Sequence, residues 1–218
     1  MSKKTKALII VAAALFLALA GMATYFLIYY RFVRVPTGGM ANTIIPGDRV
    51  FCRMHLGEIK RGDIVIFKLP TDPKVMYLKR VIGLPGETIQ VKGRRVFVNG
   101  KELAEERALI SLANPQEPQL PVVKVEPKPQ DAWYRVFYDV ERYSDNDEFE
   151  INRRAVYGVA EPYKIPPDNY FLLGDSRDNS EDSRYWGTVQ REMIVGKAMM
   201  IVDSTAKVTE KRSFKSLE

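Results

Sequence analysis

The chain has 218 residues, 46% of them hydrophobic and 28% charged, with a net charge of +6 and a pI near 9.3. Its one cysteine, Cys52, excludes an intrachain disulfide, and with one histidine, His55, it is too little for a Cys/His metal site. This length suits one well-cored domain with attachments.

The basic residues are dispersed along the chain and are not clustered among aromatic side chains, which argues against a nucleic-acid partner. Attraction to anionic lipid headgroups beside a membrane anchor is the simpler account of the positive excess. We expect His55 to be a solvated loop residue.

Residues 7–30 form an apolar run without a single charge. As a helix the run would be about 36 Å long, enough to cross a hydrocarbon core of about 30 Å. Three lysines lie in residues 1–6, which favours a cytoplasmic N-terminus. The alternative is a cleavable signal peptide, since residues 18–20 read Ala-Leu-Ala, but the apolar run continues well beyond them and ends in two tyrosines and an arginine. We therefore predict an uncleaved single-pass anchor over 7–30.

Beyond the anchor the hydrophobic pattern has a period of two. It predicts strands at 48–53, 63–69, 75–82, 88–91, 95–98, 170–173 and 194–202. Gly-Asp and Asn-Gly pairs between these segments are typical of tight turns. Short strands at regular intervals indicate a mainly β fold, an antiparallel barrel or sandwich without βαβ units.

Residues 104–165 interrupt this pattern. Five prolines fall between Pro115 and Pro129, a charged stretch occupies 139–154, and strand-like pieces appear at 122–123 and 133–140. We predict a smaller, partly ordered module inserted into a domain that spans 31–203. The core of that domain would comprise 35–103 and 166–203, and 204–218 would be a flexible polar tail.

The strand at 75–82 carries two adjacent cations, Lys79 and Arg80. Successive side chains point to opposite faces of a strand, so one of the two is expected to turn inward among apolar neighbours. A desolvated lysine has a lowered pKa and can act as a base near neutral pH. The alternative is an edge strand on which both side chains reach into solvent.

Two further stretches attract attention. Residues 174–187 read GDSRDNSEDSRYWG, a polar loop that could satisfy its own backbone and pair Asp with Arg, or simply be solvated. Residues 35–44 read VPTGGMANTI, where Pro36, Gly38 and Gly39 allow a tight turn. Exposed backbone N–H groups in such a turn can hold an oxyanion.

In their order behind an N-terminal anchor, these stretches resemble the type I signal peptidases, membrane-anchored Ser/Lys endopeptidases that remove signal peptides from exported proteins. PTGGMANTIIPGD is similar to the family's P-S-x-S-M-x-P-T-L-x-x-G-D box, and RGDIVIF to its second box. YLKRVIGLPGE is similar to the lysine box, and GDSRDNSEDSRYWG to the final box. The resemblance runs from the anchor to about Val202.

The resemblance implies that Lys79 is the general base, kept neutral by burial, and that Ser180 helps to orient its amine. The Thr37 hydroxyl and the backbone N–H at position 39 would form the oxyanion hole. Asp182 and Arg184 would be a structural ion pair beneath the site. Asp175 stands where the final box begins.

The implied substrate is the signal peptide of an exported preprotein, bound as an extended strand along a sheet edge. Small residues at −1 and −3, as in A-x-A sites, would fill apolar pockets near Met40 and Ile44. The resemblance implies no cofactor and no metal. It places the protein in the bacterial plasma membrane, with the N-terminus cytoplasmic and the domain extracytoplasmic.

The sequence departs from the family pattern at three positions. Gly39 stands where the nucleophilic serine is expected, Asn42 replaces a proline, and Ser176 replaces an asparagine. Three hypotheses follow: a relocated nucleophile, Thr37 or Thr43; a catalytically inert, membrane-tethered protein that binds signal peptides; or an engineered Ser→Gly change, against which the departure at Asn42 argues.

Overall fold

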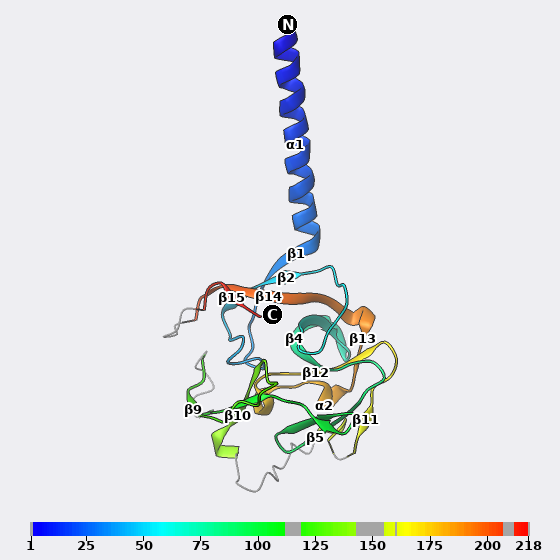
Figure 1. The fold of residues 1–218 in the computed structure, drawn as a ribbon, viewed down its shortest axis with the longest axis vertical. Helices are drawn as coiled ribbons and strands as arrows, with labels where there is room; N and C mark the ends of the chain where they lie inside the picture. The colour runs from blue at the N-terminus through cyan, green and yellow to red at the C-terminus, as the bar shows by residue number, and fades with distance from the viewer. Residues whose placement is uncertain (1, 112–118, 143–154, 160, 207–211, 218) are drawn as a thin grey trace.

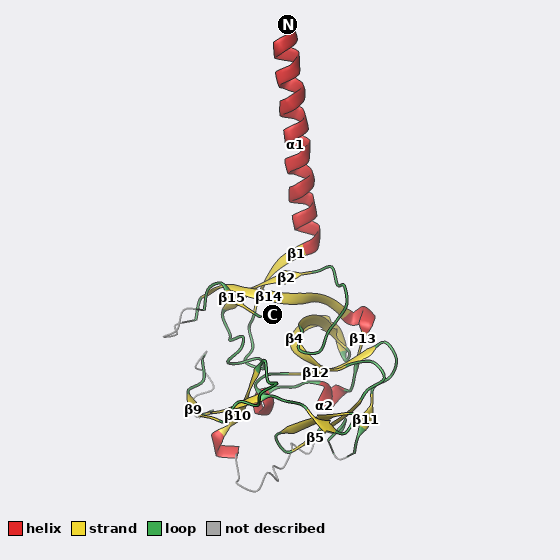
Figure 2. Cartoon of the chain, viewed as in Figure 1, coloured by secondary structure: helices red, strands yellow, loops and turns green. Residues whose placement is uncertain are grey.

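The computed structural model describes residues 2–111, 119–142, 155–159, 161–206 and 212–217. A long helix, α1 (Lys3–Tyr29), projects from a β-rich body (Figures 1 and 2). None of its residues is buried, and it is long and apolar enough to cross a membrane. It begins earlier than predicted because the Ser2 hydroxyl caps it, accepting a hydrogen bond from the Thr5 N–H at 3.1 Å.

The main sheet has eight antiparallel strands in the order β1-β2-β14-β3-β4-β12-β13, with β15 paired to β14. Their bounds are β1 Tyr30–Arg34, β2 Asp48–Arg53, β3 Ile64–Leu69, β4 Asp72–Gly83, β12 Asn169–Leu173, β13 Val189–Gln190, β14 Ile194–Ser204 and β15 Lys215–Ser216. The prediction of a mainly β, antiparallel fold behind one apolar helix is confirmed. The strand β1 was not predicted; it continues directly from α1 and connects the helix to the sheet edge (Figure 1).

Two smaller sheets complete the body. One is antiparallel, in the order β11-β5-β6-β7, and the other has the order β10-β8-β9. Their bounds are β5 Thr88–Lys92, β6 Arg95–Val98, β7 Lys101–Glu102, β8 Glu106–Ile110, β9 Val122–Val125, β10 Arg135–Asp139 and β11 Tyr163–Lys164. The strands β8 and β10 pair in parallel, because β9 runs back between them in sequence and β10 then repeats the direction of β8. The only α-helix of the described body is the short α2 (Ser183–Trp186), and one-turn 3₁₀ helices lie at Val140–Arg142, Arg177–Asn179 and Arg191–Met193.

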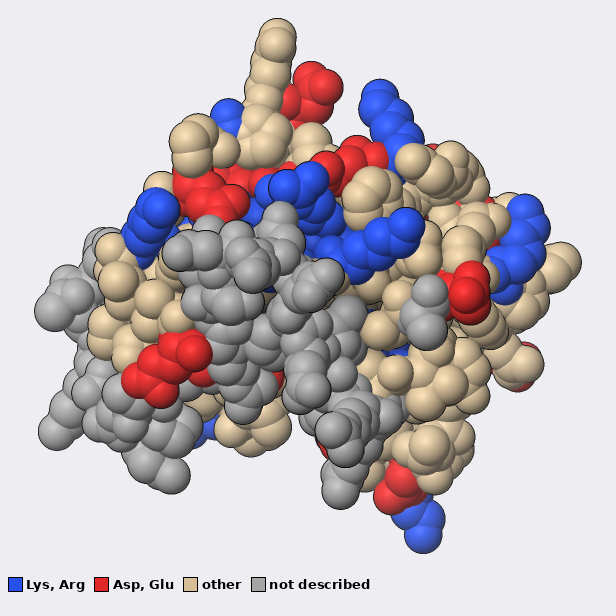
Figure 3. Space-filling model, turned by 90° about the horizontal axis from the view of Figure 1, so that it is seen from below, with Lys and Arg blue, Asp and Glu red and all other residues tan. Residues whose placement is uncertain are grey.

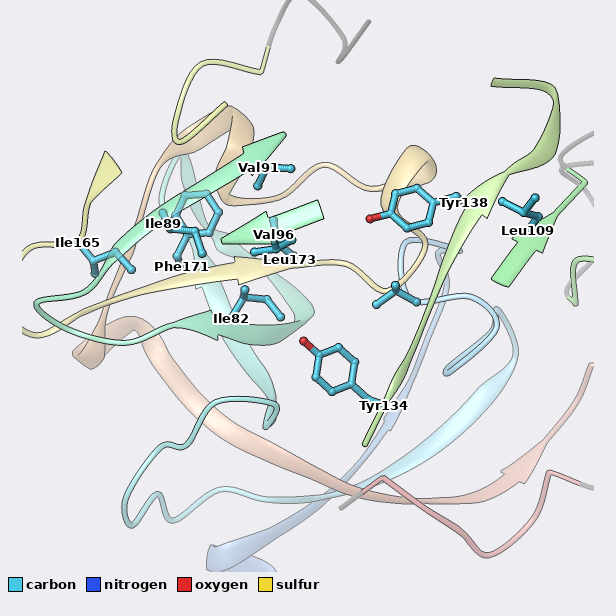
Figure 4. Close-up of a cluster of buried hydrophobic side chains, with 11 residues drawn as sticks. Ile82, Ile89, Val91, Val96, Leu109, Tyr134, Tyr138, Ile165, Phe171 and Leu173 are labelled. Atoms are coloured by element: carbon cyan, nitrogen blue, oxygen red, sulfur yellow. The ribbon is translucent and has the colours of Figure 1, made fainter. Parts of the chain in front are cut away.

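One buried apolar cluster joins these sheets (Figure 4). Ile82 of β4 and Phe171 of β12 meet Ile89 of β5 there, and Tyr134 and Tyr138 reach them from the segment predicted as an insertion. The described part of that segment therefore shares the core of the domain. Most of its predicted charged stretch, 143–154, lies outside the described residues.

The C-terminal segment 212–217 differs from the flexible tail that the sequence predicts. Arg212 is only 5% exposed, and its Nη2 lies 2.6 Å from Asp48 Oδ2 and donates to the Thr43 carbonyl at 2.9 Å. The fully buried Asp48 carboxylate requires a cationic partner, and Arg212 supplies it. Next to it β15 adds to β14. Residues 207–211 lie outside the described part of the chain.

Charged side chains of both signs are interspersed among uncharged ones on the face of the body turned away from α1 (Figure 3). His55 is exposed, as expected, and packs edge-on against Tyr29 with ring centroids 5.4 Å apart. Cys52 is buried, and this burial raises the pKa of its thiol to about 12, so it is unreactive at neutral pH. Within the described ranges, no group of three or more His, Cys, Asp or Glu side chains could hold a metal ion.

Candidate active site

Lys79 and Arg80 are adjacent on β4, and both are buried, with exposed fractions of 5% and 4%. The expectation that one of the two turns inward is thus too narrow, and the solvent-exposed alternative is wrong. Both cations are buried because β4 lies between β3 and β12 and is covered on both faces near its C-terminal end.

Arg80 is fully paired. Its Nε and Nη2 donate to the two carboxylate oxygens of Asp175 at 2.8 and 2.6 Å, and its Nη1 donates to the Gly62 carbonyl at 2.7 Å. Burial alone would lower the pKa of Arg80, but the adjacent Asp175 carboxylate reverses the effect and raises it. Asp175 is therefore the partner of Arg80, on the face of β4 opposite to Lys79.

Lys79 has a different environment. In the described part of the chain its Nζ makes no hydrogen bond or ion pair, and it lies 5.5 Å from the centre of the Tyr77 ring. Burial lowers the pKa of Lys79 from 10.5 to about 8, an effect that the Asp182 carboxylate partly opposes. A substantial fraction of this amine is thus neutral just above physiological pH, as a proton acceptor must be.

Position 39 adjoins this amine. A Cβ atom placed on Gly39 would lie 2.7 Å from Lys79 Nζ and 3.7 Å from Ser180 Oγ. Three segments far apart in the sequence, around residues 39, 79 and 180, therefore converge at one point. The Gly39 carbonyl accepts a hydrogen bond from the Ser176 N–H at 3.3 Å, while the Gly39 N–H has no acceptor among the described residues.

Ser180 follows the 3₁₀ turn Arg177–Asn179 and is 7% exposed. Its Oγ has no hydrogen-bond partner among the described residues, so it does not bond directly to the Lys79 amine. Gly174 packs against it: a Cβ there would lie 2.2 Å from Ser180 Oγ and 2.4 Å from the Gly39 carbonyl oxygen. Sequence reasoning did not select Gly174, although its place directly after an apolar strand was a signal of close backbone approach.

The ion pair expected in the final loop is present. Asp182 Oδ1 lies 2.8 Å from Arg184 Nε, and Asp182 Oδ2 accepts the Gly174 N–H at 3.1 Å. Burial alone would raise the pKa of Asp182, but Arg184 beside it holds the pKa below its ordinary value. The ion pair thus holds the loop 174–187 in the conformation that brings Gly174 against Ser180.

A second buried pair was not predicted. Arg177 donates to both carboxylate oxygens of Glu105, which also accepts the Tyr134 hydroxyl at 2.8 Å. In the same region the Phe137 N–H donates to the Asp175 carbonyl at 2.8 Å. These contacts join Glu105 and residues 134–137 to the loop 174–187. No local sequence pattern around Glu105 predicts that it pairs with Arg177.

A groove of about 320 Å³ leads to Lys79 between the chain before position 40 and β4. Thr37 and Met40 line it together with Lys79, and so do the exposed Val75 and Met76. Ile44 is fully buried in the core beside Met40 and is not part of the lining.

Thr43 lines a different cavity, of about 280 Å³, together with Arg80 and Trp133. The structure therefore places Thr37 in the same groove as Lys79, but not Thr43. Asn42, the departure next to it, exchanges two hydrogen bonds with the backbone of Leu120, at 2.7 and 2.8 Å, and so fastens this loop to the 104–140 segment.

Residues 6–202 match the model of a protein family described as signal peptidase, peptidase S26. The chain belongs to this family. Its relatives include the signal peptidase I of Pseudomonas fluorescens, 30% identical over 199 residues, with 77% of this chain and 63% of that protein covered. The signal peptidase I of Rickettsia canadensis (strain McKiel) is 32% identical over 195 residues, with 78% and 71% covered.

The chain thus spans only about two thirds of the length of these relatives. A crystal structure of a signal peptidase I from Enterococcus faecalis V583 matches 66% of this chain and 98% of that one, with 24% identity and a TM-score of 0.40.

Proposed function

We propose that this protein binds the N-terminal signal peptides of exported preproteins and cleaves them, with Lys79 as the general base. The observation that carries the proposal is the position of the Lys79 amine. It is buried, without a partner among the described residues, and beside position 39, and Lys79 is one of the residues that line an apolar groove. Family membership supports the same chemistry.

The groove suits the substrate. The peptide would lie extended between the chain around Thr37 and β4, with small side chains at −1 and −3, as in A-x-A sites, filling the space beside Met40. A groove of about 320 Å³ accommodates small apolar side chains. The Gly39 N–H, which has no acceptor in the described part of the chain, would donate to the oxyanion.

Because Gly39 has no hydroxyl, the attacking atom has to come from elsewhere. Thr37 is exposed and lines the same groove as Lys79, so we assign its hydroxyl as the substitute nucleophile. Lys79 Nζ would take the proton of Thr37 Oγ1 while that oxygen attacks the scissile carbonyl. The protonated Lys79 would then give the proton to the leaving amine, and water would hydrolyse the resulting ester.

A second candidate is a catalytically inert protein that retains the peptide groove. One specific observation favours it: Lys79 Nζ lies within 2.7 Å of the Cβ position at residue 39, so the amine fills the space that a serine side chain would need. Such a protein would bind signal peptides and release them uncut.

We further propose that α1 anchors the protein in the bacterial plasma membrane. Residues 1–6 would remain cytoplasmic, where their three lysines favour retention, and the domain from 31 to 203 would be extracytoplasmic. The apolar helix and its absence of buried residues support this arrangement.

Cleavage of an A-x-A preprotein by four forms of the full chain tests the proposal. We expect slow cleavage by the wild type, its loss in Thr37→Ala and Lys79→Ala, and a gain of at least about 100-fold in Gly39→Ser, within the range that a lost nucleophile costs. Wild-type cleavage that survives Thr37→Ala would exclude the assignment of Thr37. Peptide binding without wild-type cleavage would favour the inert protein, and neither binding nor cleavage in wild type and Gly39→Ser would exclude both.

A further inference from the structure

The Lys79 amine is not covered by a side chain of residue 39. Its Nζ has no hydrogen-bond or ion-pair partner among the residues that the structure describes, and a Cβ at Gly39 would come within 2.7 Å of it. Lys79 also belongs to the wall of the 320 Å³ groove. A molecule in the groove would therefore lie against Lys79, with no side chain at residue 39 to shield the amine.

The chemistry of such an amine extends beyond proton transfer. A neutral primary amine in apolar surroundings is a nucleophile toward carbonyl carbon, and desolvated lysines form imines with carbonyl compounds. With the pKa of Lys79 lowered to about 8 by burial, about one amine in ten is neutral at pH 7, against fewer than about one in a thousand for a solvated lysine.

We infer that Lys79 is a carbonyl-reactive site that captures aliphatic aldehydes from the groove as imines. Nζ attacks the aldehyde carbon to form a carbinolamine, and the two amine hydrogens leave with the former carbonyl oxygen as water, giving Lys79–N=CH–R. No oxidant or reductant takes part. The step breaks no peptide bond and needs no hydroxyl at position 37 or 39, so it is a separate activity from the proposed cleavage.

The groove determines which aldehydes fit. Apart from Arg34, Thr37, Tyr77 and Lys79 itself, the side chains that line it are aliphatic or thioether groups, such as those of Met40 and Leu78. A hydrocarbon chain would bury apolar surface there, whereas the hydroxyl group of a short hydroxylated aldehyde would lose its contacts with water. The expected ligand class is therefore an aliphatic aldehyde.

The first test compares lysines within one molecule. The full chain in detergent micelles is treated at pH 7 with hexanal and sodium cyanoborohydride, which reduces imines irreversibly, and the alkylated lysines are located by peptide mass mapping. We expect Lys79 to be modified at least about ten-fold faster than the exposed Lys60 and Lys101, and faster by hexanal than by glycolaldehyde. Equal rates at Lys79 and the exposed lysines, or no preference for hexanal, would overturn the inference.

Two neighbouring glycines provide a matched pair of variants. Neither has a positive φ, so alanine is allowed at both. Gly39→Ala places a methyl group 2.7 Å from Lys79 Nζ, whereas the nearest described atom to the methyl group of Gly38→Ala is Asn179 Nδ2, at 3.3 Å. We expect modification of Lys79 to fall several-fold in Gly39→Ala and to stay unchanged in Gly38→Ala; an equal effect of the two would contradict the role of position 39.

The cleavage assay remains an independent readout. If Lys79 is modified but the preprotein is not cleaved, the inference of an aldehyde site is supported and the proposed peptidase activity is contradicted. If the preprotein is cleaved but Lys79 is not modified selectively, the peptidase activity is supported and the aldehyde site is contradicted.

Discussion

The pKa values of two neighbouring buried cations on opposite faces of β4 are shifted in opposite directions. Arg80 is buried against Asp175 in a bidentate ion pair that raises its pKa. Lys79, one residue earlier and equally buried, has no ion-pair partner among the residues that the structure describes, and its pKa falls to about 8. Burial is the same on both faces, so the partner decides the outcome. A paired buried cation holds structure together, and an unpaired one is available for chemistry.

The largest effect should come from removing the paired cation. Arg80→Met leaves the fully buried Asp175 carboxylate without its partner, and we expect the free energy of unfolding to fall by about 3 to 5 kcal/mol. Lys79→Met removes a buried amine that has no partner in the described part of the chain, and it should leave this free energy unchanged or raise it. Urea unfolding of both variants at pH 7 measures the contrast, and equal losses would mean that the two faces do not differ as described.

The second prediction concerns the pH dependence of the free energy of unfolding, to which Lys79 contributes because burial lowers its pKa. Below about pH 8 the amine is protonated both in the folded and in the unfolded chain, and the cost of burying its charge is fully present. Between about pH 8 and 10.5 the unfolded chain keeps the proton that the folded chain has lost, so the free energy of unfolding rises with pH, by about 3 kcal/mol in total.

The control for this rise is Lys79→Met, which lacks the titrating group but keeps every other one. The difference in free energy of unfolding between wild type and this variant, measured in urea at several pH values, should therefore change between pH 8 and 10.5. Parallel curves for the two proteins would show that the pKa of Lys79 is not lowered by folding.

A smaller effect is expected where the final loop meets position 39. Gly174→Ala forces a methyl group against Ser180 Oγ and the Gly39 carbonyl oxygen, and we expect a loss of about 1 to 3 kcal/mol from overpacking. Gly38→Ala, whose nearest neighbour is 3.3 Å away, is the matched control and should lose less. Thermal unfolding followed by circular dichroism distinguishes the two variants. An equally stable Gly174→Ala would show that the loop 174–187 shifts to accommodate the methyl group.

The smallest effect should come from a cation that is paired but solvated. Arg135 Nη2 lies 2.9 Å from Glu106 Oε1, yet 42% of the Arg135 side chain is exposed. Arg135→Met should change the free energy of unfolding by less than about 1 kcal/mol, because water screens the pair. A loss as large as that of Arg80→Met would show that the loss of free energy of unfolding depends on ion pairing alone and not on whether the ion pair is buried.

The sequence predicts strands and short-range contacts well, but it predicts poorly which residues distant in the sequence pair with or cover one another. Alternation places Lys79 and Arg80 on opposite faces of a strand, but it cannot tell that both faces are covered, because coverage depends on distant segments. The same reason explains why Asp182–Arg184, two residues apart, is predictable while Arg177–Glu105 and Arg212–Asp48 are not. The roles of Lys79, Ser180 and Thr37 stay predictions, since geometry alone shows proximity and burial.

The order of strands in the main sheet also determines when the molecule can assemble. The strand β14 lies between β2 and β3, so that Cys52 pairs with Ala198, near the far end of the chain. Pairings this distant in sequence make folding slow, because a long loop must close before they form. The edges of β2 and β3 that pair with β14 therefore stay without their hydrogen-bond partner until β14 is synthesised. During that interval these edges can pair with strands of other chains, which leads to aggregation.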